Sequence, residues 1–65
     1  MYQMKKLNFK IQQRKIAKEV GITEETLSRI INQKQNTTKM TAYCITKAIN
    51  NESEINDYFN RQGEI

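Results

Sequence analysis

The segment from Ile16 to Asn32 (IAKEVGITEETLSRIIN) constrains the fold of this 65-residue chain more than any other stretch. Apolar residues recur at helical spacing on both sides of Gly21, where a helix can end in a left-handed turn. Thr23 is a favourable N-cap for a second helix, and Glu24 and Glu25 follow in the first turn, where the helix dipole favours acids. Because two helices joined by so short a turn must cross steeply, the segment predicts a helix-turn-helix.

The composition argues against several kinds of site. The chain has a single cysteine, Cys44, and no histidine, so it offers neither an intrachain disulfide nor the usual zinc ligands. No nucleophile–base pair can be assembled from the remaining residue types, so we expect no enzymatic activity, no cofactor and no metal. We also find no apolar run long enough to cross a bilayer and no secretion signal. These features predict a cytoplasmic protein without a membrane partner or a small-molecule substrate.

Positive charge is concentrated in the first half of the chain. The net charge is +4 at pH 7, and the residues after position 34 are close to balanced. The basic residues of the first half are Lys5, Lys6, Lys10, Arg14, Lys15, Lys18, Arg29 and Lys34, against the acids Glu19, Glu24 and Glu25. This asymmetry favours a polyanionic partner, although an ordinary solvated surface gives the same pattern.

The segments on either side of the helix pair are predicted less sharply. Residues 1–11 fit a short helix through Met4 and Leu7, but Leu7, Phe9 and Ile11 alternate as in a strand, so we expect a short helix or turn that becomes extended near Phe9. The helical spacing of apolar residues from Met40 to Ile49 predicts a packing helix. We expect Asn50 and Asn51 to end it in a left-handed cap, Ser53 to cap a last short helix that contains Ile55, Tyr58 and Phe59, and residues 60–65 to fray.

The second helix of the pair has a distinct outer face. If Leu27, Ile30 and Ile31 are buried, a rotation of about 100° per residue puts Glu25, Arg29 and Asn32 on the opposite side. Glu25 and Arg29 stand four residues apart, which suits an ion pair. That pair is either a surface salt bridge of small energetic weight or a brace that holds Arg29 for bidentate contact with guanine.

The stretch from Gln13 to Phe59 resembles the phage repressor and Cro family of helix-turn-helix proteins, the lambda-repressor-like XRE type. IAKEVGI is similar to the family's first motif helix and turn glycine, TEETLSRIIN to its recognition helix, and AYCITKAIN to the packing helix that follows. The resemblance implies an all-α domain of four or five helices, with or without a short extended N-terminal segment. It implies a single domain over residues 1–65, with an N-terminal segment (1–11), the helix-turn-helix (12–32), packing helices (40–59) and a tail (60–65).

The resemblance also implies which residues meet DNA. The expected base-reading residues are Thr23, Glu24, Glu25 and Arg29, joined by Ser28 on the flank of the same face. The expected phosphate contacts are Gln13, Arg14, Asn32, Lys34, Asn36, Thr37, Thr38 and Lys39. This chain departs from the family pattern at Gln33, where glycine is usual, so the helix is expected to end differently. Glu24 and Glu25 also depart, because acids near phosphates cost repulsion unless one accepts from a cytosine amino group or pairs with Arg29.

The implied function is sequence-specific binding of double-stranded DNA by a small transcriptional regulator, a Cro-like repressor of a prophage or mobile element. A homodimer would place two recognition helices in major-groove half-sites about 34 Å apart on a two-fold operator. The candidates for its interface are Tyr43 and Tyr58, together with the N-terminal segment. Ile55 and Phe59 are further candidates, but we expect them to lie in the intramolecular core. The alternative is a protein-interaction module of the same fold (an antirepressor, an antitoxin or an inhibitor of a host protein), because fold does not fix function.

Overall fold

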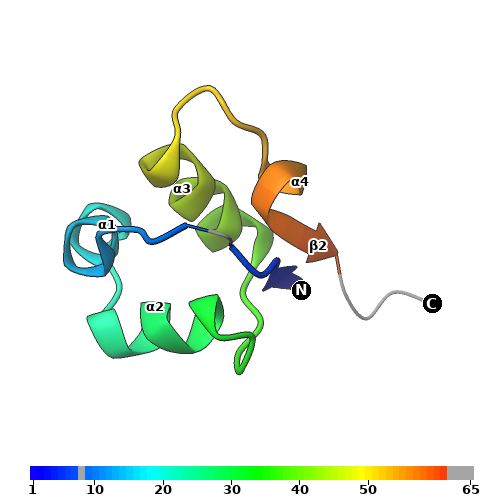
Figure 1. The fold of residues 1–65 in the computed structure, drawn as a ribbon. Helices are drawn as coiled ribbons and strands as arrows, with labels where there is room; N and C mark the ends of the chain where they lie inside the picture. The colour runs from blue at the N-terminus through cyan, green and yellow to red at the C-terminus, as the bar shows by residue number, and fades with distance from the viewer. Residues whose placement is uncertain (8, 62–65) are drawn as a thin grey trace.

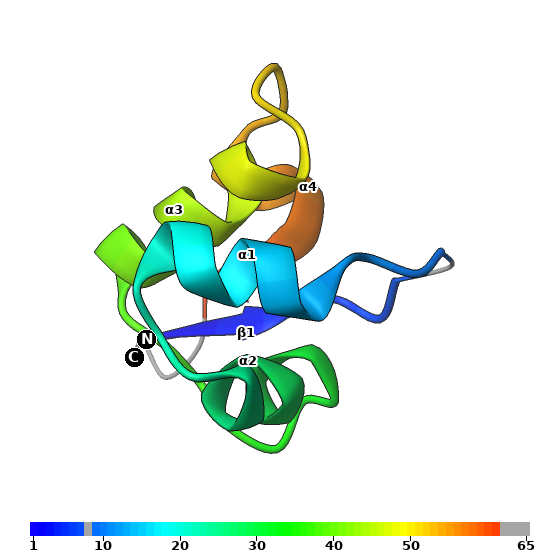
Figure 2. The ribbon, with the colours of Figure 1, turned by 90° about the vertical axis from the view of Figure 1, so that its left-hand side faces the viewer.

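The computed structural model describes residues 1–7 and 9–61, which form four helices and two short strands (Figure 1). In chain order these are β1 (Tyr2–Met4), α1 (Gln13–Val20), α2 (Glu24–Ile31), α3 (Lys39–Ile49), α4 (Ile55–Tyr58) and β2 (Phe59–Arg61). Figure 2 shows α1 crossing in front of the molecule, with α2 below it and α3 above. The expected largely helical fold is therefore confirmed, and short strands occupy the two ends of the described chain.

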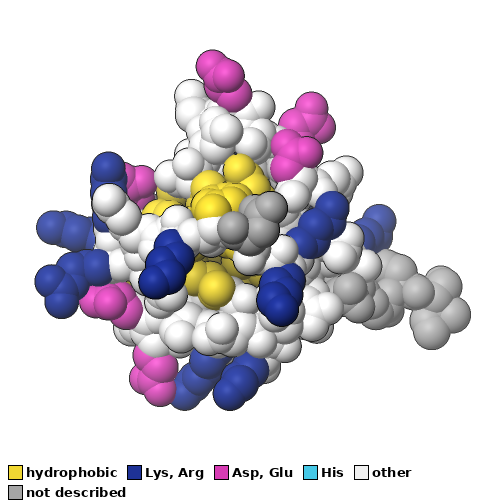
Figure 3. Space-filling model, viewed as in Figure 1, with side chains coloured by type: hydrophobic (Ala, Val, Ile, Leu, Met, Phe, Trp, Pro, Cys, Tyr) yellow, Lys and Arg dark blue, Asp and Glu magenta, His cyan; other side chains and the backbone are white. Residues whose placement is uncertain are grey.

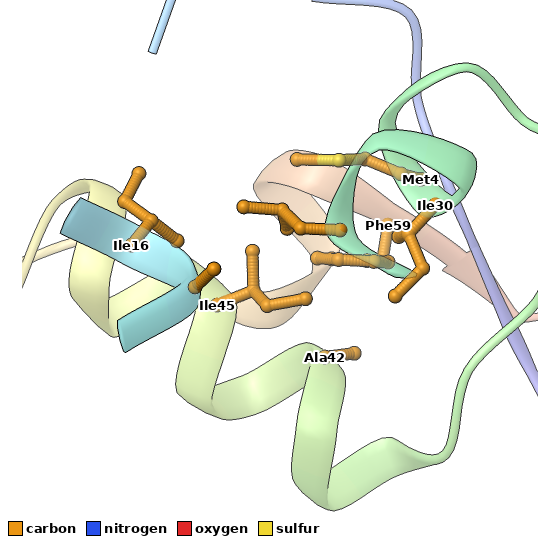
Figure 4. Close-up of a cluster of buried hydrophobic side chains, with 8 residues drawn as sticks. Met4, Ile16, Ile30, Ala42, Ile45 and Phe59 are labelled. Atoms are coloured by element: carbon orange, nitrogen blue, oxygen red, sulfur yellow. The ribbon is translucent and has the colours of Figure 1, made fainter. Parts of the chain in front are cut away.

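The core is formed where the three longer helices meet the strands. Figure 4 shows its side chains converging between α1, α2 and α3. Its members are Met4, Ile16, Ala17, Leu27, Ile30, Ala42, Ile45 and Phe59. Burying one aliphatic or aromatic side chain of this size contributes about 1.5–3 kcal/mol, so the cluster is the main source of stability in so small a domain. Two buried polar residues among those the structure describes were not predicted from the sequence, Thr37 and Thr46. The Thr46 hydroxyl donates to the Ala42 carbonyl oxygen at 2.9 Å within α3.

The turn between α1 and α2 has the local chemistry predicted from the sequence. Gly21 adopts φ +89°, and its N–H donates to the Ala17 carbonyl oxygen at 2.8 Å. A side chain at that φ is unfavourable, which explains the glycine. The Thr23 hydroxyl oxygen accepts from the Thr26 N–H at 3.1 Å and so caps α2.

The N-terminal segment differs from the prediction. Of the expected short helix or turn, the helix is wrong for the described residues 1–7 and 9–11, and the extended part lies at β1. β1 pairs antiparallel with β2, which brings Met4 opposite Phe59, and both side chains are buried. On its other edge, Tyr2 exchanges two backbone hydrogen bonds with Thr37, at 2.7 and 2.8 Å. Pairing with β2, which is distant in the sequence, decides the conformation of β1. The local periodicity of neither segment indicates this pairing.

Three details near the C-terminal end also correct the predictions. Neither Asn50 nor Asn51 has a positive φ, so the left-handed cap after α3 is wrong. α4 is capped by Glu54 rather than Ser53, because the Glu54 N–H donates to the Asp57 carboxylate at 2.9 Å. Asn60, expected to fray, belongs with Arg61 to β2, and residues 62–65 of the predicted tail lie outside the described residues.

The end of α2 explains why glutamine stands where the family usually has glycine. Gln33 adopts φ +60°, and the N–H groups of Gln33 and Lys34 donate to the carbonyl oxygens of Ile30 and Arg29 in a Schellman arrangement. The Gln33 side-chain amide donates to the carbonyl oxygens of Ile31 at 2.8 Å and Met4 at 3.1 Å. The backbone strain of a non-glycine residue in the left-handed region is thus offset by two side-chain hydrogen bonds. The bond to the Met4 carbonyl oxygen also fastens β1 to the end of α2.

We expect Gln33→Ala to destabilise the fold by about 1–3 kcal/mol, because it keeps the left-handed strain and loses both side-chain hydrogen bonds. Gln33→Gly loses the same two hydrogen bonds but relieves the backbone strain. It should therefore destabilise the fold by only about 0–1 kcal/mol relative to the parent. Urea unfolding followed by circular dichroism measures both. Equal stability of the parent and Gln33→Ala would show that the amide contributes nothing.

Candidate nucleic-acid interface

The outer face of α2 carries an ion pair that holds an arginine outward. Arg29 Nη2 lies 2.7 Å from Glu25 Oε2, and the two side chains are 53% and 76% exposed. On the opposite side of the helix, Leu27 and Ile30 are fully buried, as predicted. An ion pair this exposed contributes at most about 1 kcal/mol to stability. Its clearer effect is to restrict the directions in which the Arg29 guanidinium points.

The remaining predicted base-reading residues lie along the same helix. Thr23, Glu24, Glu25 and Arg29 are exposed, and Ser28 is half-buried. The Thr23 hydroxyl donates to the Thr26 hydroxyl at 2.9 Å while it accepts the capping hydrogen bond, so its proton is already engaged. The Asn32 amide donates to the Ser28 hydroxyl oxygen at 3.3 Å, which joins the flank of this face to the end of the helix. These five side chains thus form one surface, and their contact with bases stays a prediction.

A second ion pair joins the two helices of the motif. Arg14 Nε, in the first turn of α1, donates to Glu24 Oε2, in the first turn of α2, at 3.2 Å. From the sequence, Arg14 is expected at a phosphate and Glu24 at the bases, with no contact between them. Their pairing depends on the crossing of α1 over α2, and no sequence spacing indicates it. Glu24 therefore neutralises part of the positive charge at the start of α1.

The start of α1 is open to an anion. Gln12 makes no side-chain capping hydrogen bond, and the first turn of α1 has no acidic residue, so its backbone N–H groups retain the positive end of the helix dipole. Gln13 is half-buried and Arg14 is exposed at this end. α2, by contrast, is capped by Thr23 and carries two acids in its first turn. Of these two helix starts, that of α1 is the better suited to a phosphate.

The loop after α2 is only partly available as a phosphate contact. Lys34, Asn36, Thr38 and Lys39 are exposed. Thr37 is 7% exposed and both of its backbone groups bond Tyr2, so the structure does not support its predicted role at a phosphate. The Thr38 hydroxyl caps α3 by accepting from the Thr41 N–H at 3.3 Å. The ion pairs among the described residues involve neither Lys34 nor Lys39, which leaves both ammonium groups available.

Charge is distributed unevenly over the surface (Figure 3). Lysine and arginine side chains lie around α1 and over the middle and lower parts of the view, on the side of the molecule where α2 lies. Acidic side chains at the top lie over the connection between α3 and α4 and over α4 itself. Among the described residues, the acidic side chains that follow α3 therefore lie away from α2.

The residues predicted for a dimer interface have different environments. Tyr43 is 53% exposed on α3, with the Lys47 ammonium 5.5 Å from the centre of its ring. Tyr58 is half-buried, its ring meets the edge of Phe9 with 6.3 Å between centroids, and its hydroxyl accepts from Ser53 at 3.4 Å. Phe59 is core, as preferred from the sequence, and Ile55 packs against the core. Tyr43 remains the stronger candidate.

Comparison with known proteins identifies the family of this chain. A family model described as helix-turn-helix matches residues 2–55, which include β1, α1, α2 and α3. No curated protein and no solved structure matches the chain. In the described residues, no helix has the length and apolar character needed to cross a membrane. The chain belongs to the XRE-type, lambda-repressor-like helix-turn-helix family, and it is a DNA-binding regulator.

Proposed function

We propose that this protein is a sequence-specific, Cro-like repressor of a prophage or mobile element, and that α2 enters the major groove of its operator. The observation that carries this proposal is the outer face of α2, where Arg29 is directed outward by Glu25 while the opposite face is buried. The Cro-like role and the prophage origin rest on the resemblance of the three motif segments to that family. We propose that residues 1–65 act as one DNA-binding unit in the cytoplasm of a bacterial host.

Arg29 and Glu25 suit recognition of a G·C base pair. The Arg29 guanidinium has five N–H donors, so the contact between Nη2 and Glu25 leaves donors for O6 and N7 of guanine. The Glu25 carboxylate can in turn accept from the amino group of a cytosine. The Glu25 carboxylate thus both orients Arg29 and can accept from a cytosine. These two roles explain why an acid is tolerated between the two phosphate strands. Thr23, Glu24 and Ser28 complete the proposed reading surface.

Contacts with the DNA backbone would orient α2 in the groove. The proposed set consists of Gln13 and Arg14 at the uncapped start of α1, Asn32 at the end of α2, and Lys34, Asn36, Thr38 and Lys39 in and after the loop. These contacts supply affinity that falls as salt rises, because each neutralised phosphate releases counterions. Two copies on a two-fold operator would bring two such surfaces to successive major grooves on one side of the duplex.

A protein-interaction module of the same fold remains the second candidate. The exposed acids Glu24 and Glu25 favour it, because they reduce the attraction of α2 for phosphates. Selection of bound duplexes from a random pool separates the two functions. A regulator enriches one sequence, whereas an interaction module shows no preference among duplexes.

Arg29→Ala should weaken binding to the selected operator by about 1–3 kcal/mol and relax the preference at one base pair. The reason is the loss of a bidentate contact to guanine. Lys18→Ala is the matched control, since it removes one exposed positive charge from α1 outside the proposed surface. Titration of operators with single base changes measures the effect. An Arg29→Ala protein that discriminates among these operators as well as the parent does would exclude Arg29 from base recognition.

Lys34→Ala and Lys39→Ala should each weaken binding to all duplexes alike. Because each would remove one phosphate contact, the slope of log K against log salt should become shallower by about one unit. The selected preference for one sequence should not change. Unchanged slopes in both variants would remove the loop after α2 from the proposed backbone contacts.

Glu24→Gln should increase the affinity for duplex DNA of any sequence and make the salt dependence steeper by about one unit. It removes a negative charge beside the phosphates and releases Arg14, which can then make its own phosphate contact. The double variant Arg14→Gln, Glu24→Gln should lose the steeper slope. Stability should change by less than about 1 kcal/mol in either variant, because the ion pair is exposed.

A further inference from the structure

β1 is bonded along both of its edges, and each edge meets a different part of the chain. In Figure 1 the strand at the N label lies between β2 and the connection from α2 to α3. One edge pairs with β2, where Gln3 stands opposite Asn60. The other edge meets residues 33–37, and we call it the loop edge of β1. It consists of the N–H and carbonyl groups of Tyr2 and the carbonyl group of Met4.

Three hydrogen bonds join the loop edge of β1 to the connection after α2. The Tyr2 N–H donates to the Thr37 carbonyl oxygen at 2.7 Å, and the Tyr2 carbonyl oxygen accepts from the Thr37 N–H at 2.8 Å. The Met4 carbonyl oxygen accepts from the Gln33 side-chain amide at 3.1 Å. Because neighbouring residues of a strand direct their backbone groups to opposite edges, these three groups are not the ones that pair with β2. The two edges can therefore be altered separately.

Two of the proposed phosphate contacts lie between the points that the loop edge of β1 holds. Lys34 and Asn36 are exposed, and they stand between Gln33 and Thr37 in the chain. At one end, the left-handed Gln33 is stabilised by its hydrogen bond to β1. At the other end, Thr37 is buried and its backbone is paired with Tyr2. The conformation of this short segment is thus held at both ends by contacts with β1.

From this arrangement we propose that Tyr2 and Gln33 are positioning residues, which act through Lys34 on the DNA backbone. The inference rests on the proposed function, in which Lys34 contacts a phosphate. A loop that is ordered before binding loses less entropy when its side chain meets a phosphate. Lys39 does not depend on β1 in this way, because it is the first residue of α3 and the Thr38 hydroxyl caps that helix.

A purely structural role for β1 gives a different expectation. The Met4 side chain is buried, so detachment of the whole strand would destabilise the domain and weaken every DNA contact together. The loop edge, however, uses backbone groups of β1, and its loss removes no side chain from the core. Variants of the loop edge should therefore change the contact made by Lys34 and leave that of Lys39 unchanged.

Tyr2→Pro tests the inference, and Tyr2→Ala is its matched control. Both lose the tyrosine side chain, but only proline removes the N–H that bonds Thr37. Relative to Tyr2→Ala, Tyr2→Pro should bind every duplex about three- to tenfold more weakly, and the slope of log K against log salt should be shallower by about one unit. The preference among operators with single base changes should not change, because burial of Leu27 and Ile30 sets the position of α2.

A double-mutant cycle with Lys34→Ala separates positioning from a general loss of stability. Lys34→Ala should weaken binding in the Tyr2→Ala protein and change it by less than about twofold in the Tyr2→Pro protein. Lys39→Ala should weaken binding equally in both. Equal effects of Lys34→Ala in the two backgrounds would overturn the proposal, as would a Tyr2→Pro protein with the affinity and salt slope of Tyr2→Ala. Urea unfolding checks that each variant is folded.

Gln33→Asn provides a second test that does not depend on the folding of Tyr2→Pro. Asparagine tolerates the left-handed region, so the end of α2 is kept. Its side chain is one methylene shorter, so the hydrogen bond to the Met4 carbonyl oxygen is lost. Lys34→Ala should weaken binding less in this background than in the parent. An undiminished effect of Lys34→Ala would overturn the role of Gln33.

Hydrogen exchange of the free protein distinguishes failure of this proposal from failure of the proposed function. The Thr37 amide should exchange about tenfold faster in Tyr2→Pro than in Tyr2→Ala, while the amides of α3 keep their protection. Equal exchange of the Thr37 amide would overturn the proposal whatever the result with DNA. If exchange is faster but the parent binds no duplex, β1 holds the loop as inferred, and the proposed function fails together with the contact of Lys34 with a phosphate.

Discussion

The burial of Leu27 and Ile30 in the hydrophobic core is the constraint on which the rest of this structure depends. Because these two side chains are fully buried, the rotation of α2 about its axis is fixed. That rotation directs Arg29 and Glu25 outward. Ala17, small and buried on α1, lets α2 approach closely enough for this packing. The surface proposed for DNA is thus a consequence of what the opposite side of the same helix buries.

The two ion pairs adjust this surface instead of stabilising the fold. Both are exposed, so solvent screening keeps their contribution to stability small. Glu25 limits the orientations of Arg29, which in the proposed complex would lower the entropy that Arg29 loses on binding DNA. Glu24 pairs with Arg14, so part of the positive charge at the start of α1 is balanced within the protein. Acids that look unfavourable on a reading helix therefore have structural partners.

The ends of the described chain supply the support that a domain of this size needs. Small domains bury a limited fraction of their surface, so each additional core side chain matters. Pairing of β1 with β2 brings Met4 and Phe59 into the core, and Gln33 and Thr37 tie β1 to the end of α2 and to the loop that follows. The loop that carries Lys34 and leads to Lys39, the first residue of α3, is consequently anchored at Thr37, so Thr37 is not available as a surface contact.

Local chemistry in the sequence was sufficient to predict α1, the Gly21 turn, the Thr23 cap, α2 and α3, because helical periodicity and capping act over a few residues. The same periodicity predicted the outward position of Arg29 and its pairing with Glu25, four residues away. Tertiary structure alone decided the β1–β2 pairing, the link between Arg14 and Glu24, the burial of Thr37 and the two hydrogen bonds that let Gln33 replace glycine. Each of these, apart from the short-range bond from Gln33 to Ile31, joins groups brought together by the packing of the helices, and contacts of that kind leave no periodic signal in either partner's own sequence.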